Sequence, residues 1–523
     1  MTTNCPADIK PYAQSTEPTT PSIFNLNYCS QDFWSLKTRL IDFINERFGS
    51  QGTEIPNTFN DFVESSIAVM LVENWAFLAD TLSFKIDQIA NELFIDTVTE
   101  VENAFRLAKL VGFQPTPPIA ARSKWLAQIN NVLTTDVAID TPFRIDIPST
   151  TGNPTSIELF AADSSFMPLY DEQIIIPAGS KFNKSIVGLE GRTIEEEFTG
   201  SGQVAQTISL SFLPVIYDSI RVEVDGKTWD QVDYFTDSQR RQEYRVEFNS
   251  NYQGFVMFGN NRTGAIPSNG SRILITYRIG GGTAGNIVTG SVETQGQVVV
   301  PGLDFTVPIT YRNYSKGEFG YDGDGINEIR RNLPKWLRTQ DRAVTDLDYK
   351  TLADQFSTPY FGKIGKSTAV LRNYGCAANI IDLYLLAQDG TDLVIASNEL
   401  KTSLNDELNS KKMFTDFVCL KDGVVKIVDV SLDFTVNKFY KKFELEIKTN
   451  VTNRITAFFD INNWDYNQIL KDTDLIKQIS DIKEIESIQI TFVTQDGVSG
   501  TTVVPKFYEI IRPDNISISF IYN

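Results

Sequence analysis

The sequence contains no histidine among its 523 residues. The absence of imidazole excludes Ser-His-Asp and Cys-His nucleophilic sites, and it excludes every zinc site that needs a histidine ligand. Cysteine is also scarce, and its four copies are far apart and form no C-x-x-C pair: Cys5, Cys29, Cys376 and Cys419. We therefore expect reduced thiols in a cytosolic setting and no disulfide framework.

A long hydrophobic run and a signal peptide are missing as well. No uninterrupted run of about 18 apolar residues occurs, which is the length that a membrane-spanning helix needs. The first 22 residues lack the basic start and apolar core of a signal peptide. The sequence therefore predicts a soluble protein that does not insert into a membrane.

Positive charge is in deficit. Lysine and arginine number 47 against 66 aspartate and glutamate residues, which gives a net charge of −19. Nucleic-acid binding depends largely on Lys and Arg displacing counterions, so we expect no nucleic-acid partner. The 41% apolar content is sufficient for packed cores, and the length predicts three or four domains of about 100–200 residues each.

The N-terminal part is predicted to be an arm followed by helices. Residues 1–29 are expected to form an extended arm, which is either a disordered tail or a segment that becomes ordered on a partner. The helical region covers 30–114. Its apolar spacing predicts a first helix after Ser30, a long second helix from Thr58 or Asn60 to about Asn91, and a third opened by a capping box of Thr97 and Glu100.

The long second helix carries more apolar residues than one neighbouring helix can cover. Trp75, Phe77 and Phe84 lie beside the main apolar stripe of this helix. Two interpretations remain open. These rings are either buried against the third helix or the next domain, or they pack on another chain.

Residues 115–310 predict one or more all-β domains. Val222 and Val224 alternate with polar residues before the turn Asp225-Gly226, which is typical of a hairpin, and the strand Ser271–Arg278 is apolar on both faces. Glu195–Glu197 is an acidic triplet. Paired carboxylates could serve glycoside hydrolysis or bind a metal, but a solvated strand edge is the simpler interpretation.

Gly280, Gly282 and Gly285 form a G-x-G-x-x-G pattern after a predicted strand, with Asp304 about 20 residues further on. A dinucleotide site also needs a helix N-terminus for the pyrophosphate, whereas Asn286–Val300 is rich in β-branched residues and has no helical period. We therefore interpret the glycines as a structural turn.

Residues 311–365 predict a helical linker region. The acidic segment Gly320–Glu328 suggests a calcium loop, but the EF-hand spacing fails at Ile326 and Leu333. The helix Ile326–Arg338 carries a basic patch, which is either a solvated face or a docking site for an acidic neighbour. A second helix, Asp346–Phe356, begins with Thr345 as its N-cap.

Residues 366–523 predict a ferredoxin-like α/β domain with one sheet face under helices. The expected elements are strands near 381–385, 428–436 and 488–492, helices near 398–408, 443–458 and 468–480, and an edge strand at 507–522. The fold class is therefore predicted to be a multidomain α+β protein: an N-terminal helical region, central all-β domains and a C-terminal ferredoxin-like domain.

Three segments resemble the baseplate J-like family of contractile phage tails and related injection machines. They are FGNNRTGAIPSNGSRILITYRIGGGTAGNI (258–287), the helix-turn-helix of 327–356 containing Arg342-Ala343-Val344-Thr345, and IIIPAGSKF (174–182). The resemblance implies a structural baseplate wedge component located in the virion tail and assembled in the host cytoplasm. Its implied partners are other wedge proteins, further copies of itself, and sheath or hub components.

A second function class remains open beside this one, a tail-associated protein that binds or cleaves glycans. The sequence offers no catalytic, cofactor-binding or metal-binding residues that we can assign, and we expect no enzyme activity and no cofactor.

Overall fold

The computed structural model describes residues 32–48, 63, 66–129, 136–139, 142–147, 155–162, 168–169, 173–178, 183–237, 241–299, 306–374, 378–390, 392–482 and 484–522. The described chain divides into two compact units. The helical unit holds the described residues from 32 to 115 together with Asp324–Pro334. The β-rich unit holds Thr116–Gly323 and the chain from Lys335 onward. The predicted arm at 1–29 lies outside the described residues, and the predicted domain boundaries stay a prediction.

The helical unit contains α1 (Phe33–Phe48), α2 (Ile67–Asn91), α3 (Val101–Leu110) and the first part of α4 (Ile326–Thr339). The three predicted N-terminal helices are thus present. The predicted start of the second helix, Thr58 or Asn60, lies outside the described residues, but the described Val63 is not helical and α2 begins only at Ile67. α1 packs against α2 along one narrow stripe, and only Val69 and Ala76 of α2 are buried. These two residues are seven positions apart, so they lie on the same side of the helix.

The predicted capping box of α3 is wrong. Glu100 is the N-cap of α3 but makes no side-chain cap, and the Thr97 hydroxyl donates instead to the carbonyl of Asn91. The cap comes from the end of α2, because the Glu92 carboxylate accepts hydrogen bonds from the backbone N–H groups of Thr99 and Glu100. The Glu92 carboxylate therefore accepts the N-terminal hydrogen bonds that a local Thr-x-x-Glu capping box would otherwise accept.

α2 is long and apolar enough to cross a membrane, judged by length and composition alone. The relevant stretch of this helix has a mean hydropathy of 1.4, and 17% of it is buried. Polar residues interrupt the apolar run of α2, so a search for uninterrupted runs does not find this helix although its mean hydropathy is high.

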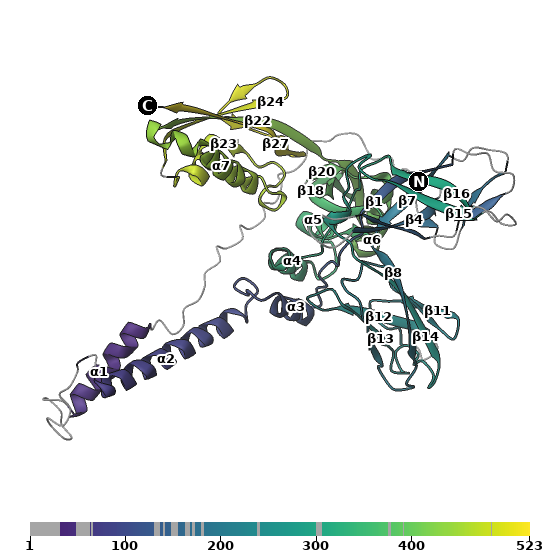
Figure 1. Ribbon diagram of the computed structural model, residues 1–523, viewed down its shortest axis with the longest axis horizontal. Coiled ribbons are helices and arrows are strands. Elements are labelled where there is room, and N and C mark those ends of the chain that lie inside the picture. The colour runs from purple at the N-terminus through teal and green to yellow at the C-terminus, as the bar shows by residue number, and fades with distance from the viewer. Residues whose placement is uncertain are drawn as a thin grey trace. The chain divides into compact units, whose positions relative to one another are not determined.

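The β-rich unit begins with a seven-stranded antiparallel sheet in the order β15-β16-β1-β7-β4-β3, with β5 paired to β4 (Figure 1). Its strands are β1 (Arg122–Gln128), β3 (Phe143–Ile147), β4 (Thr155–Ala162), β5 (Pro168–Leu169), β7 (Asn183–Glu190), β15 (Glu293–Val299) and β16 (Thr306–Asn313). β2 (Val137–Ile139) pairs separately with β6 (Ile174–Ile176). The core of this sheet includes the fully buried Trp125 and Tyr311.

A second seven-stranded sheet has the order β8-β14-β10-β11-β12-β13-β9. Its strands are β8 (Arg192–Thr199), β9 (Thr207–Ser209), β10 (Arg221–Val224), β11 (Lys227–Gln231), β12 (Glu243–Phe248), β13 (Gly254–Phe258) and β14 (Arg272–Ile279). The predicted hairpin at Asp225-Gly226 joins β10 to β11, and the predicted inner strand is β14, which pairs with β8 and β10. Both predictions are confirmed, as is the edge position of the Glu195–Glu197 strand.

A third sheet has the order β17-β18-β19-β20, with β21 paired parallel to β19. Its strands are β17 (Ser357–Thr358), β18 (Gly362–Tyr374), β19 (Ala378–Asp389), β20 (Asp392–Ile395) and β21 (Asp416–Asp422). Two helices pack on it, α5 (Asp346–Asp354) and α6 (Asn398–Lys411). The predicted N-cap of α5 is confirmed, because the Thr345 side chain accepts from the N–H of Asp348 in a capping box.

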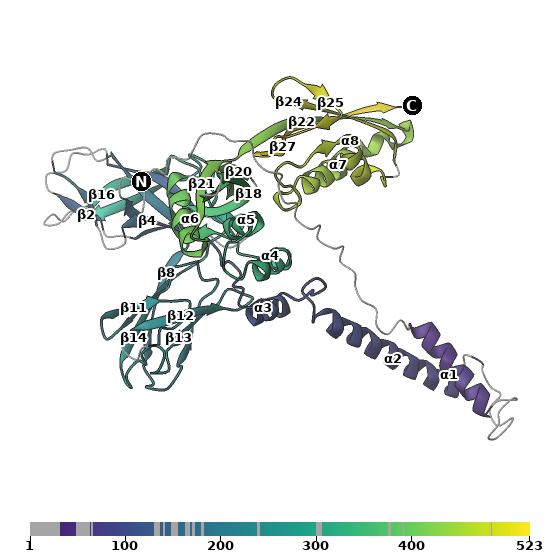
Figure 2. The same cartoon turned by 180° about the vertical axis from the view of Figure 1, so that it is seen from behind.

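The last sheet has the order β25-β24-β22-β27. Its strands are β22 (Val424–Val436), β24 (Ile485–Thr494), β25 (Ser499–Gly500) and β27 (Glu509–Tyr522), and β23 (Leu470–Lys471) pairs with β26 (Thr502–Val503) beside it. The helices α7 (Glu444–Phe458) and α8 (Asp472–Ile479) both cover one face (Figure 2). β27 is an edge strand, as predicted.

The prediction of a single ferredoxin-like domain at 366–523 is not confirmed. The predicted strand at 381–385 belongs to β19 of the third sheet, whereas those at 428–436 and 488–492 belong to the last sheet. β19 forms a long local hairpin with β18, and this contact removes it from the sheet that the sequence pattern assigned to it. Moreover, the short strand between α7 and α8, β23, pairs with β26 and not with β22 or β24, so both helices are inserted between two strands of the last sheet.

Candidate functional site

The densest group of exposed apolar side chains in the described chain lies on α2. We call it the α2 surface; its residues are Ile67, Met70, Leu71, Trp75, Phe77, Leu78, Leu82, Phe84, Ile86 and Ile89. Each of these side chains is at least 48% exposed. Hydrophobic surface of this extent along one helix of a folded protein is typical of an interaction site.

The three aromatic residues singled out from the sequence are part of this surface. Trp75, Phe77 and Phe84 are each 65% exposed. Neither α1 nor α3 therefore covers these rings, and the interpretation that they are buried against the third helix is wrong. Burial against the next domain and packing on another chain both stay open as predictions.

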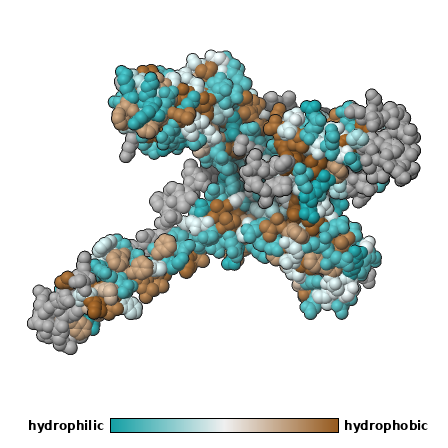
Figure 3. Space-filling view, in the orientation of Figure 1, coloured by the Kyte–Doolittle hydropathy of each residue, from teal (hydrophilic) through white to brown (hydrophobic). Residues whose placement is uncertain are grey.

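Acidic groups are mixed with the apolar side chains of α2. The helix carries Glu73, Asp80 and Asp87 against a single lysine, Lys85. The Glu73 carboxylate pairs with Lys37 of α1 at 2.7 Å, which fixes the two helices against each other. Hydrophobic and hydrophilic surface alternate along this helix pair in Figure 3.

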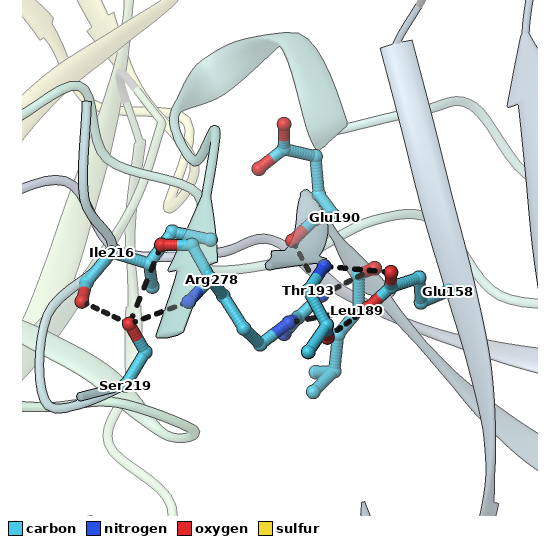
Figure 4. A network of polar contacts seen from close by, with 7 residues as sticks. All are labelled: Glu158, Leu189, Glu190, Thr193, Ile216, Ser219 and Arg278. Atoms are coloured by element: carbon cyan, nitrogen blue, oxygen red, sulfur yellow. Dashed lines mark hydrogen bonds and ion pairs between the residues drawn. The ribbon is translucent and has the colours of Figure 1, made fainter. Parts of the chain in front are cut away.

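A buried network of charged groups connects the first two sheets at the place where β7 ends and β8 begins (Figure 4). Arg278 of β14 is 4% exposed, and its guanidinium donates to the carbonyls of Leu189 and Glu190 at 3.2 and 3.0 Å. Its Nε lies 3.5 Å from Oε2 of Glu158 on β4. Glu158 in turn accepts from the backbone N–H and the hydroxyl of Thr193 on β8, both at 2.7 Å. Side chains of β4, β8 and β14 thus hold the β7–β8 connection.

Glu190 is the buried acid beside this network. Burial raises the pKa of its carboxyl to about 7, and the nearby Asp322 carboxylate adds to the rise. The charge of Arg278 and the N–H of Gly281 act in the opposite direction. Its Oε2 atom has no hydrogen-bond partner within the described chain. Burial prevails because an ionised carboxylate loses most of its hydration there.

We expect Glu190→Gln to stabilise the protein above pH 7. The pKa of Glu190 in the folded protein lies above the ordinary value of 4.5. The contribution of this carboxyl to the free energy of unfolding is therefore fully present below about pH 4.5 and is lost as the pH rises through about 7. The difference corresponds to at most about 3 kcal/mol. Between pH 5 and pH 8 the melting temperature of the wild type should fall more than that of Glu190→Gln. The exposed Glu195→Gln is the control; an identical pH profile for all three proteins would contradict the argument.

The glycines after β14 form a turn and not a phosphate site. Gly280, Gly281 and Gly282 all have positive φ values, between 93° and 121°, and a short 3-10 turn, Thr283–Gly285, follows. The N–H of Thr283 already donates to the Asp322 carboxylate at 2.8 Å. A side-chain anion therefore occupies the donor that a phosphate would need, as the structural interpretation predicted.

Gly282→Val is expected to destabilise the protein by roughly 2–4 kcal/mol. At φ 121° a β-branched side chain is strained, and its Cβ would collide with the Asp322 carboxylate. The matched control is Gly270→Val, which also has positive φ but has open space around it. The melting temperature of Gly282→Val should be well below that of this control. Equal melting temperatures would show that the collision with Asp322 does not destabilise the protein.

Two residues of the acidic triplet on β8 contact side chains of the neighbouring strand β14. Glu196 accepts from the Tyr277 hydroxyl at 2.9 Å, and Glu197 pairs with Arg272 at 2.9 Å. Successive strand residues point to opposite faces, so Glu196 cannot act together with either neighbour as a carboxylate pair. Across the described ranges, no group of three or more acidic or cysteine side chains could hold a metal ion.

The acidic segment at 320–328 and the basic helix α4 also have structural contacts. Glu328 accepts from the N–H of Gly325, and Asp322 accepts from Thr283. Arg330, one of the predicted basic-patch residues, donates to the carbonyl of Val98 inside the helical unit. This contact accounts for Arg330; the other predicted basic residues of this helix are Arg331, Lys335 and Arg338.

Sequence reasoning missed the network of Glu158, Arg278 and Glu190. A signal was present, because Arg278 directly follows the apolar strand residues Ile273–Tyr277 and Glu158 lies within the apolar run of β4. A charged residue inside a buried strand indicates a partner of opposite charge. The identity of that partner depends on sheet packing, which one sequence does not show.

Residues 32–110 match the model of one protein family, described as the bacteriophage baseplate protein, N-terminal domain. This stretch comprises α1, α2 and α3, and it differs from the segments at 174–356 that carried the resemblance in the sequence. The predicted resemblance to baseplate proteins is thereby confirmed.

One solved structure with a similar chain is described as the cryo-EM structure of the anti-feeding prophage baseplate, 6-fold symmetrised. The identity is 12%, the TM-score is 0.36, and the match covers 87% of this chain and 88% of that chain. Because the TM-score is low, no conclusion about fold or function rests on this likeness. No curated protein matches the sequence.

Proposed function

We propose that this chain is a structural wedge component of a contractile-tail baseplate. In this proposal it assembles with other wedge proteins and with further copies of itself into a ring around the hub, and it contacts sheath or hub components. The proposal rests on the observation that two features occur in the same stretch of the chain. The stretch that matches a baseplate domain, 32–110, is also the stretch in which α2 exposes its apolar side chains.

The α2 surface is better suited to a protein partner than to lipid. Glu73 and Asp80 lie in the first two-thirds of the helix, and each ionised carboxylate near a bilayer centre costs about 2.5–3.5 kcal/mol on insertion scales. In a helical bundle the same groups can remain at the edge of the contact, where Glu73 already pairs with Lys37. At 25 residues α2 spans about 37 Å, which is long enough for an extended helix-helix contact.

The proposed mechanism is mechanical. Buried charged contacts such as the Arg278 network join the sheets of the β-rich unit into bodies that can move as wholes. A ring of such subunits can adopt two discrete packings, and the change between them would trigger sheath contraction. Two residues of the acidic triplet, Glu196 and Glu197, are engaged in contacts with β14, which supports a role without catalysis. The proposed location is the virion tail baseplate, after assembly in the host cytoplasm.

Deleting residues 1–91 should test this proposal. The cut removes α1 and α2 but keeps Glu92, which caps α3, and it keeps the buried Ile329 and Leu333 of α4 in the same unit as α3. We expect a folded protein that no longer co-purifies with tail particles, whereas the full chain does. If the shortened chain still joined the particles in equal amount, the α1–α2 pair would not be the assembly element.

A further inference from the structure

A second exposed surface lies beside the last sheet, where β22 leads into α7. It consists of the 3-10 helix Lys438–Phe443 and the first turns of α7, and we call it the basic aromatic patch. Its apolar members are uncovered: Phe439 is 69% exposed, Phe443 is 40% exposed and Leu445 is 78% exposed. None of them contributes to the buried core of the last sheet and its helices, and none belongs to the α2 surface.

The patch is held in a defined conformation. The Asn437 side chain caps its start by accepting from the N–H of Phe439 at 3.0 Å, and Tyr440 packs against the core of the last sheet. The Lys442 Nζ lies over the rings of both Phe439 and Phe443, at 5.3 and 4.9 Å from their centroids. A partner would therefore meet an ordered surface, and little conformational entropy would be lost on binding.

The charge of the patch is opposite to that of the chain. Between 438 and 448 there are four exposed lysines, namely Lys438, Lys441, Lys442 and Lys448, against two carboxylates, Glu444 and Glu446. The whole chain carries a net charge of −19. A concentration of cations on such a protein attracts a carboxylate-bearing partner, and the exposed rings favour apolar side chains between the carboxylates.

We propose that the basic aromatic patch binds an acidic segment of another protein chain, in which apolar side chains alternate with carboxylates. A protein segment fits better than a lipid surface, because an anionic bilayer would repel the acidic remainder of the chain and because Glu444 and Glu446 lie within the patch. Nucleic acid is disfavoured by the same net charge. The proposal adds a docking site to the one on α2 and does not depend on it.

The test uses the full-length protein and a fluorescent peptide of repeating Glu-Glu-Leu units. We expect binding by fluorescence anisotropy in low salt, a strong loss when the ionic strength is raised, and no binding of a Lys-Lys-Leu peptide. Lys441→Glu with Lys442→Glu should weaken binding about tenfold or more. The matched control, Lys471→Glu with Lys477→Glu, reverses two exposed lysines of α8 and its flank in the same domain and should change binding far less.

Two further measurements complete the test. Phe439→Ser should weaken peptide binding without lowering the melting temperature, because the ring is exposed. A variant of the α2 surface, Phe77→Glu with Phe84→Glu, should bind the peptide as the wild type does, which separates this site from the assembly surface. Equal loss in the patch variant and the α8 control, or binding to phosphatidylserine vesicles in place of the peptide, would overturn the proposal.

Discussion

Arg278→Met is expected to lower the free energy of unfolding by about 3–5 kcal/mol. The substitution keeps most of the side-chain volume but removes the only guanidinium that reaches Glu158 within the described network. Glu158 is 4% exposed and would remain buried without its cation, and the carbonyls of Leu189 and Glu190 would each lose a donor. Leaving a buried charge uncompensated costs far more than the pair itself contributes.

The same strand supplies the control for this prediction. Arg272 also belongs to β14 and pairs with Glu197 on β8, but the two side chains are 63% and 59% exposed. Exposed pairs contribute about 0–1 kcal/mol, so Arg272→Met should change the melting temperature little. Adding Glu158→Gln to Arg278→Met should recover part of the loss, because it removes the unpaired charge. If Arg272→Met and Arg278→Met lowered the free energy of unfolding equally, the buried network would not stabilise the β7–β8 connection.

Much of the local structure could be predicted because short-range signals determine it. The Thr345 cap, the Asp225-Gly226 hairpin and the helix that contains Pro334 all depend on residues within a few positions of one another. Such elements form wherever local propensity and tertiary packing agree. The same holds for the apolar spacing of α2, which the sequence shows directly.

The division into sheets could not be predicted in the same way. β21 ends at Asp422 and β22 begins at Val424, so the chain passes from one sheet to the next at Gly423. The Asp422-Gly423 pair is a turn signal in the sequence, but it does not say that the strands on its two sides join different partners. Likewise, Arg278 and Glu158 are 120 positions apart in the chain, and their contact depends on how β4 and β14 pack.

Phe77→Glu combined with Phe84→Glu should leave the isolated chain folded and abolish its incorporation into tail particles. Both rings are 65% exposed, so adding a carboxylate at each position costs little in the free chain. In an assembled bundle the same positions would be enclosed, and two buried, unpaired carboxylates would each cost several kcal/mol. We therefore expect normal melting and circular dichroism together with a large loss in co-purification.

The control carries two equivalent changes away from α2. Tyr234→Glu with Val288→Glu replaces side chains of the β-rich unit that are 78% and 72% exposed, and it adds the same charge. This protein should join the particles as the wild type does, since neither residue belongs to the α2 surface. If the α2 variant instead unfolded on its own, its rings would be part of an internal core. If it joined the particles in normal amount, a partner on this face of α2 would be excluded, because no close apolar contact can enclose two carboxylates without a measurable loss.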